Sequence, residues 1–200
     1  MKTLSRIGVM LAATLGTFAA LPANAQDAAD PCAEANACRE ISEFLIEGPD
    51  GQTHRIPADM TLPWVVDGNI LITPGEALVV ELVSMDGALV PELRRTGDEA
   101  RLEELGPGEV LFEFGAFDRG AISLTVRSAY PETLEYAALI VDFGQGPSRT
   151  SVCRLMPGVT VREIWQQPVV QLALWSFRPA DDYACDIIDP DADFSEREAQ

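Results

Sequence analysis

The feature that most constrains the fold is an alternation of apolar and polar side chains at a period of two. It runs through residues 78–82, 110–114 and 122–126. This is the period of a β-strand that buries one face. Residues 136–143 and 169–177 are apolar on both parities, with Trp175 and Phe177 on one face of the second run. We expect these two runs to be central strands.

Turn residues separate the runs where antiparallel strands need them. Asp67-Gly68-Asn69 lies between apolar residues 64–66 and 70–72, and the two flanks with this turn predict a hairpin in which Gly and Asn accept positive φ. Pro74-Gly75 and Asp86-Gly87 end neighbouring strands. The pattern predicts about nine short strands spaced by about 10 residues, typical of an all-β, immunoglobulin-like antiparallel β-sandwich.

One segment departs from this period. From Thr96 to Leu105, Thr96 precedes Glu99 by a capping-box spacing, Leu102 and Leu105 are three residues apart, and Gly106 follows. We expect one or two helical turns that cross between the sheets. Their role is topological rather than chemical.

The amino terminus has the three parts of a secretory leader. Residues 1–25 combine Lys2 and Arg6, an apolar stretch and a small-residue ending at Ala23-Asn24-Ala25. The apolar stretch is shorter than the roughly 20 residues that cross a bilayer, so we expect a cleaved signal peptide and no membrane span in the mature chain. The leader is of bacterial type and favours a periplasmic address.

The remainder divides into a lead-in at residues 26–37, a sandwich domain at 38–187 and an acidic, mobile tail at 188–200. The tail holds Asp-x-Asp-x-Asp from residue 189, the spacing that opens a calcium loop. Phe194 stands where glycine must turn such a loop. We therefore assign no metal ligand there.

Four cysteines in an exported chain predict disulfides. Three pairings of Cys32, Cys38, Cys153 and Cys185 can be drawn. The pairs nearest in sequence, Cys32 with Cys38 and Cys153 with Cys185, are favoured. A zinc site is disfavoured because the chain has no Cys-x-x-Cys motif.

The charge balance excludes one class of partner. The chain has 32 acidic residues against 14 Lys and Arg, a formal net charge of -18. Such a surface repels phosphate, so nucleic-acid binding through a basic face is excluded. Cationic patches on proteins, or divalent ions, fit it better. The oligomeric state is left open.

No constellation of catalytic residues is evident. His54 is the single histidine and has no Gly-x-Ser-x-Gly nucleophile motif to serve. Glu81 and Glu113 are candidates for paired carboxylates, but they lie on the polar faces of predicted strands, where solvated side chains are ordinary. We assign no catalytic, cofactor-binding or metal residue.

The tryptophans are the remaining candidates for a binding surface. Trp64 and Trp175 lie beside or within apolar strands and are expected in the core or at its rim. Trp165 precedes Gln166, Gln167 and Pro168 and is the expected ligand or partner contact.

These features favour an exported, non-catalytic β-sandwich protein that binds or supports another cell-envelope component, such as an envelope protein. Contact through a loop cluster or an exposed sheet edge fits a sandwich of this kind. The alternative is a secreted hydrolase that uses paired carboxylates on carbohydrate or ester substrates.

Overall fold

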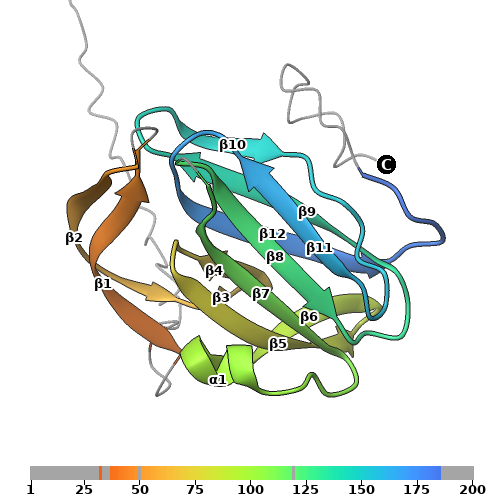
Figure 1. Ribbon diagram of the computed structural model, residues 1–200. Helices are drawn as coiled ribbons and strands as arrows, with labels where there is room; N and C mark the ends of the chain where they lie inside the picture. The colour runs from red at the N-terminus through yellow and green to blue at the C-terminus, as the bar shows by residue number, and fades with distance from the viewer. Residues whose placement is uncertain (1–31, 33–36, 49–50, 119, 186–200) are drawn as a thin grey trace, which may run out of the picture.

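The computed structural model describes residues 32, 37–48, 51–118 and 120–185 (Figure 1). This part of the chain contains twelve strands and one helix. Their bounds are β1 Cys38–Glu47, β2 Thr53–Pro63, β3 Val65–Val66, β4 Asn69–Ile72, β5 Glu76–Met85, β6 Ala88–Thr96, α1 Gly97–Leu102, β7 Glu109–Ala116, β8 Ile122–Ser128, β9 Leu134–Asp142, β10 Gly146–Thr150, β11 Thr160–Trp165 and β12 Val169–Pro179. The predicted leader and acidic tail lie outside the described residues.

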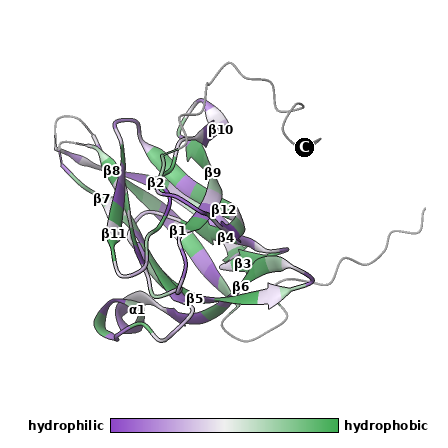
Figure 2. Ribbon diagram, turned by 90° about the vertical axis from the view of Figure 1, so that its right-hand side faces the viewer, coloured by the Kyte–Doolittle hydropathy of each residue, from purple (hydrophilic) through white to green (hydrophobic). Residues whose placement is uncertain are grey.

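Two antiparallel layers form the sandwich. One has the strand order β10-β9-β12, with β4 and β3 continuing from β12, and the other has the order β6-β5-β7-β8-β11. They are continuous through one pairing, Phe177 with Leu89, where β12 meets β6. In Figure 2, β7, β8 and β11 lie on one side, and β9, β12 and β4 on the other. The predicted all-β antiparallel sandwich is confirmed.

The described residues hold twelve strands against about nine expected, and two of those that the apolar period did not reveal are β1 and β2. They form a separate two-stranded sheet in which Ile41 is the single buried apolar side chain. With most side chains on both faces in contact with solvent, neither strand needs an apolar alternation. The strands predicted from the period of two, by contrast, are found as β5, β7 and β8, and the two continuous apolar runs are found as β9 and β12.

The core lies between the two layers and is rich in aromatic side chains. Phe112 of β7 is fully buried, and its ring meets Tyr136 of β9 and Phe177 of β12 edge to face, at centroid distances of 6.5 and 6.1 Å. Tyr136 and Phe177 stack at 5.8 Å. Burying one such ring stabilises the fold by about 1.5–3 kcal/mol, so these side chains tie the two layers together.

The structure corrects the face of β12 on which Phe177 was predicted to lie. A strict period of two places it with Trp175, opposite Leu174. In the structure Ser176 has a φ of 56° and the register with β9 shifts between Trp175 and Arg178. This bulge adds a residue and reverses the parity, so that Phe177 is 2% exposed and joins Leu174 in the core.

The predicted helix is present but shorter, and its place differs from the expectation. It connects β6 to β7, which flank β5 in one layer, so it does not cross between the sheets. Ala100 packs with Val79 on the outer face of that layer. Thr96 occupies the N-cap without a side-chain hydrogen bond, and Leu102 is 84% exposed because the helix ends there.

The predicted hairpin at residues 64–72 is confirmed, but Asp67 rather than Asn69 shares the turn with Gly68. Asp67 and Gly68 take the positive φ values, 49° and 74°, that a two-residue turn requires. Asn69 instead begins β4, where its side-chain amide donates hydrogen bonds to the Val66 and Asp67 carbonyl oxygens.

Both favoured disulfide pairs are present. Cys32 is bonded to Cys38 at the start of β1, and Cys153 to Cys185 at the end of the described chain. Beside the second bond, Arg154 pairs with Glu135 of β9 at 2.8 Å and also with Asp182, which links the last described residues to the sandwich. Among the described residues, no helix is both long and apolar enough to cross a bilayer.

Candidate binding groove

A groove of about 630 Å³ opens between the tip of the β1–β2 hairpin and one end of the sandwich. We call it the hairpin groove. The hairpin supplies one side, and the β7–β8, β9–β10 and β11–β12 connections supply the other (Figure 1). Its lining residues are Ile46, Glu47, Gly48, His54, Arg55, Ile56, Gly120, Phe143, Gln166 and Pro168.

The hairpin is held in place at its base by Arg39. Its guanidinium donates to both carboxylate oxygens of Glu76 at 2.8 Å, and to the carbonyl oxygens of Leu62, Pro63 and Leu71 at 3.2, 2.6 and 3.1 Å. It also lies 4.0 Å above the ring of Trp64, a cation–π contact. A planar fork with five donors suits this task better than a lysine ammonium.

The walls of the hairpin groove are mainly apolar. Phe143 is 55% exposed, and its backbone N–H donates to the Pro168 carbonyl oxygen at 3.0 Å, which joins two of the connections. Ile46 and Ile56 face them from the hairpin and are half-buried. A concave apolar surface with a few polar groups is the usual form of a binding site.

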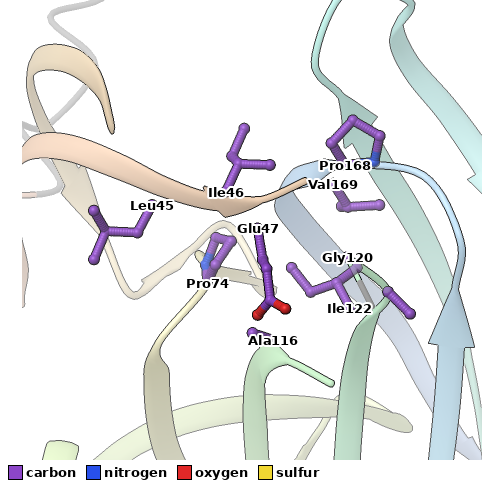
Figure 3. A pocket seen from close by; sticks show the side chains of 10 residues that line it. Leu45, Ile46, Glu47, Pro74, Ala116, Gly120, Ile122, Pro168 and Val169 are labelled. Carbon is purple, nitrogen blue, oxygen red and sulfur yellow. The ribbon is translucent and has the colours of Figure 1, made fainter. Parts of the chain in front are cut away.

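A smaller cavity of about 20 Å³ continues inward from the hairpin groove, and we call it the Glu47 pocket. The two share Ile46, Glu47, Gly120 and Pro168. The other lining residues of the Glu47 pocket are apolar (Figure 3), namely Leu45, Pro74, Ala116, Ala121, Ile122 and Val169.

Charged side chains at the hairpin groove come from the hairpin. Glu47 ends β1, and its side chain points into the Glu47 pocket toward Ala116 (Figure 3). Arg55 forms an ion pair with Glu43 on the exposed surface of the hairpin. The backbone of Glu47 pairs with Thr53 in the β1–β2 sheet, but its carboxylate has no hydrogen-bond or ion-pair partner among the described residues. Among the described lining residues, the groove therefore presents one carboxylate, that of Glu47, without a partner.

The structure places Trp165 in the core rather than on an exposed face. It is 7% exposed, its ring meets Phe114 edge to face at 6.3 Å, and its Nε1–H donates to the Thr150 hydroxyl oxygen at 2.7 Å. The surface position that a ligand contact requires is thus absent. Its neighbours Gln166 and Pro168 line the hairpin groove instead.

The two carboxylates singled out from the sequence form ion pairs with arginines. Glu81 pairs with Arg94, and Glu113 with Arg101 at 3.4 Å. His54 lines the hairpin groove. The described residues contain no group of three or more His, Cys, Asp or Glu side chains arranged to hold a metal ion.

Two further acids are perturbed by their surroundings, and both have structural partners. Burial raises the pKa of Glu109, but hydrogen bonds from Arg95 at 2.7 and 3.1 Å and from the Gly106 N–H at 2.8 Å outweigh it and hold that pKa below the usual value. Burial raises the pKa of Glu163, opposed by the hydrogen bond from the Cys153 N–H at 2.6 Å.

The hairpin groove was missed at the level of sequence because its residues come from distant segments. The one local hint was the Gln-Gln-Pro run after Trp165, which marks the β11–β12 connection.

Comparison of the chain with family models, curated proteins and solved structures finds no match.

Proposed function

We propose that this protein is exported to the periplasm and, without catalysing a reaction, binds or supports another protein of the cell envelope through the hairpin groove. The observation that carries the proposal is the concave apolar surface between the hairpin and the loop end of the sandwich. Exposed apolar surface of this kind is typical of protein interaction sites.

The surroundings of the hairpin groove support a macromolecular partner. Phe117 of the β7–β8 connection and Ile164 near the end of β11 are 45% and 44% exposed, and Leu45 of the hairpin is 46% exposed. With Phe143, they place large apolar side chains on the connections and strands that border the groove. Such clustering costs solubility unless a partner covers it.

The disulfides support the proposed compartment. Both bonds involve cysteines that the reducing conditions of a cytoplasm would keep as thiols. An oxidising envelope compartment preserves them.

The test is site-specific photo-crosslinking in the source cells. A photoreactive amino acid replaces Phe143 in the hairpin groove, or Met85, which is 53% exposed at the far end of β5. The two positions have similar exposed fractions, but Met85 lies away from the groove. β5 begins two residues after Pro74, which lines the Glu47 pocket, and Met85 is at the other end of that strand. We expect a single heavier species, containing an envelope protein, from position 143 only.

Two outcomes contradict the proposal. Identical products from both positions mean nonspecific contact, and no product from position 143 means that the hairpin groove has no protein partner in the envelope.

A further inference from the structure

We propose that the partner enters the hairpin groove with an apolar segment carrying one lysine, whose ammonium lies against the Glu47 carboxylate. This inference rests on the proposed function, because it specifies the chemistry of the partner at the same groove. Glu47 is its specificity-determining residue.

The first argument is the missing partner of Glu47. Glu76 and Glu109, two other poorly exposed carboxylates, face arginines: Glu76 meets Arg39 at 2.8 Å, and Glu109 meets Arg95 at 2.7 Å. Glu163 instead accepts a hydrogen bond from the Cys153 N–H at 2.6 Å. Glu47 is half-buried, and within the described residues nothing pairs with it. A carboxylate among apolar side chains loses solvation, and this loss is recovered only through a hydrogen-bonding or cationic partner.

The second argument is the space beside the carboxylate. The Glu47 pocket, about 20 Å³, has room for a single small group, the size of an ammonium or a water molecule. It opens into the hairpin groove, whose 630 Å³ lie in the range of ligand sites. A basic side chain can therefore reach Glu47 while its flanking apolar residues contact Phe143 and Ile56.

The third argument is charge complementarity. Arg55 also lines the groove, but its guanidinium is already paired with Glu43 and does not neutralise the charge of Glu47. The whole chain carries -18 charges, a field that attracts cationic segments and repels acidic ones. A divalent metal ion fits less well, since the hard cations of proteins need several oxygen ligands and the pocket offers one carboxylate.

The direct test uses two peptide probes with the purified protein. One is the acetylated and amidated peptide Ala-Val-Leu-Lys-Leu-Val-Ala, and the other has norleucine in place of lysine, which keeps the apolar stem and removes the charge. Binding is followed through the amide resonances of Glu47, Gly120 and Phe143. We expect the lysine peptide to bind at least tenfold more tightly than the norleucine peptide.

Variants then connect this preference to one side chain. In Glu47→Gln we expect both peptides to bind equally. In Glu40→Gln, which removes an exposed carboxylate from the same strand, we expect the tenfold preference to remain. Unchanged melting temperatures verify that both variants are folded. Equal affinities in the unmodified protein, a preference that survives Glu47→Gln, or no saturable binding up to millimolar peptide overturns the inference.

Crosslinking separates this inference from the proposed function. With the photoreactive residue at position 143, Glu47→Gln is expected to reduce the yield of the partner adduct at least tenfold. An undiminished yield overturns the role of Glu47 but leaves the groove as the partner site. Absence of any adduct in the unmodified chain overturns the proposed function, whereas the peptide preference is read independently.

Discussion

The sandwich and the β1–β2 hairpin are built from the same antiparallel pairing but are stabilised in different ways. In the sandwich, fully buried side chains such as Phe112 and Leu172 come from both layers and form one core. In the strands β1 and β2 of the hairpin, Ile41 is the one buried apolar side chain, and Arg39 supplies an attachment at the base. Apolar burial extends over the whole sandwich, whereas the hairpin is attached at its base through the Arg39 contacts and the Cys32–Cys38 disulfide.

This difference bears on the hairpin groove because each region contributes one of its sides. Phe143 and Pro168 stand on connections of the densely packed sandwich, but Ile46, Glu47 and Ile56 stand on the hairpin tip, away from its anchor. Stability differs between such regions, and the less buried one opens at lower free energy. We therefore expect the hairpin side of the groove to adjust to a partner.

The largest effect is expected from removing a ring of the core. Phe112→Ala should lower the free energy of unfolding by about 4 kcal/mol, because it deletes contacts with Tyr136 and Phe177 and leaves a cavity between the layers. Urea denaturation followed by fluorescence measures the loss. Phe117→Ala, at a 45% exposed ring, is the control and should cost much less.

The two disulfides should contribute unequally to the free energy of unfolding, and the bond attached to the sandwich should contribute more than the bond at the hairpin base. Replacing Cys153 and Cys185 by Ser opens a loop with a sequence separation of 32 and should cost about 3–4 kcal/mol. Replacing Cys32 and Cys38 opens a separation of only 6 and should cost about 2 kcal/mol, confined to the hairpin base. Equal losses in denaturation midpoint would remove this distinction.

A local effect is expected at the hairpin anchor. Arg39→Met leaves the Glu76 carboxylate without its cation, at an expected cost of about 2 kcal/mol, below the value for fully buried pairs since both side chains keep some exposure. Hydrogen exchange should accelerate in β1 and β2 while β7 and β8 stay protected. Equal acceleration in all four strands would show that the hairpin does not open independently.

A second substitution sharpens the anchor experiment. Glu76→Gln added to Arg39→Met removes the orphaned charge, so the double variant should recover part of the lost stability. A double variant less stable than Arg39→Met would mean that Glu76 acts through its other hydrogen bond, from the Thr73 N–H at 2.6 Å.

The smallest expected effect is a pH dependence of stability, and it comes from Glu109 in the sandwich. Because the pKa of Glu109 is lower in the folded state than its ordinary value of 4.5, its contribution is complete above that pH and is lost as the pH falls toward the lower folded pKa. Glu109→Gln should therefore be less stable than the unmodified protein at pH 7, and the difference should shrink below pH 4.5.

Urea midpoints at pH 7 and in acid measure this convergence. Glu104→Gln, at an exposed position of the same connection, is the control and should leave the pH dependence unchanged. A Glu109→Gln difference that grows in acid would show that the Arg95 and Gly106 hydrogen bonds do not stabilise the ionised carboxylate.

Much of the sandwich could be predicted from local patterns. The strands β5, β7 and β8 have an alternation of their own, and β9 and β12 have continuous apolar runs, because a strand's side chains directly record which of its faces is buried. The hairpin turn within residues 67–69 was equally predictable, although positive φ falls on Asp67 and Gly68 rather than on Gly68 and Asn69. The hairpin groove could not be predicted, because its sides come from the hairpin and from sandwich connections that are far apart in sequence.

The sequence by itself thus determined the all-β class, the principal strands and the preferred disulfide pairs, since each depends on neighbouring residues or on their order along the chain. Tertiary structure alone decided that Trp165 is buried, that the Ser176 bulge turns Phe177 inward, and that Glu47 lies in an apolar pocket without a described partner. The physical reason is that burial and pairing of a side chain depend on segments far away in sequence, as the contact of Arg39 with Glu76 across 37 positions demonstrates.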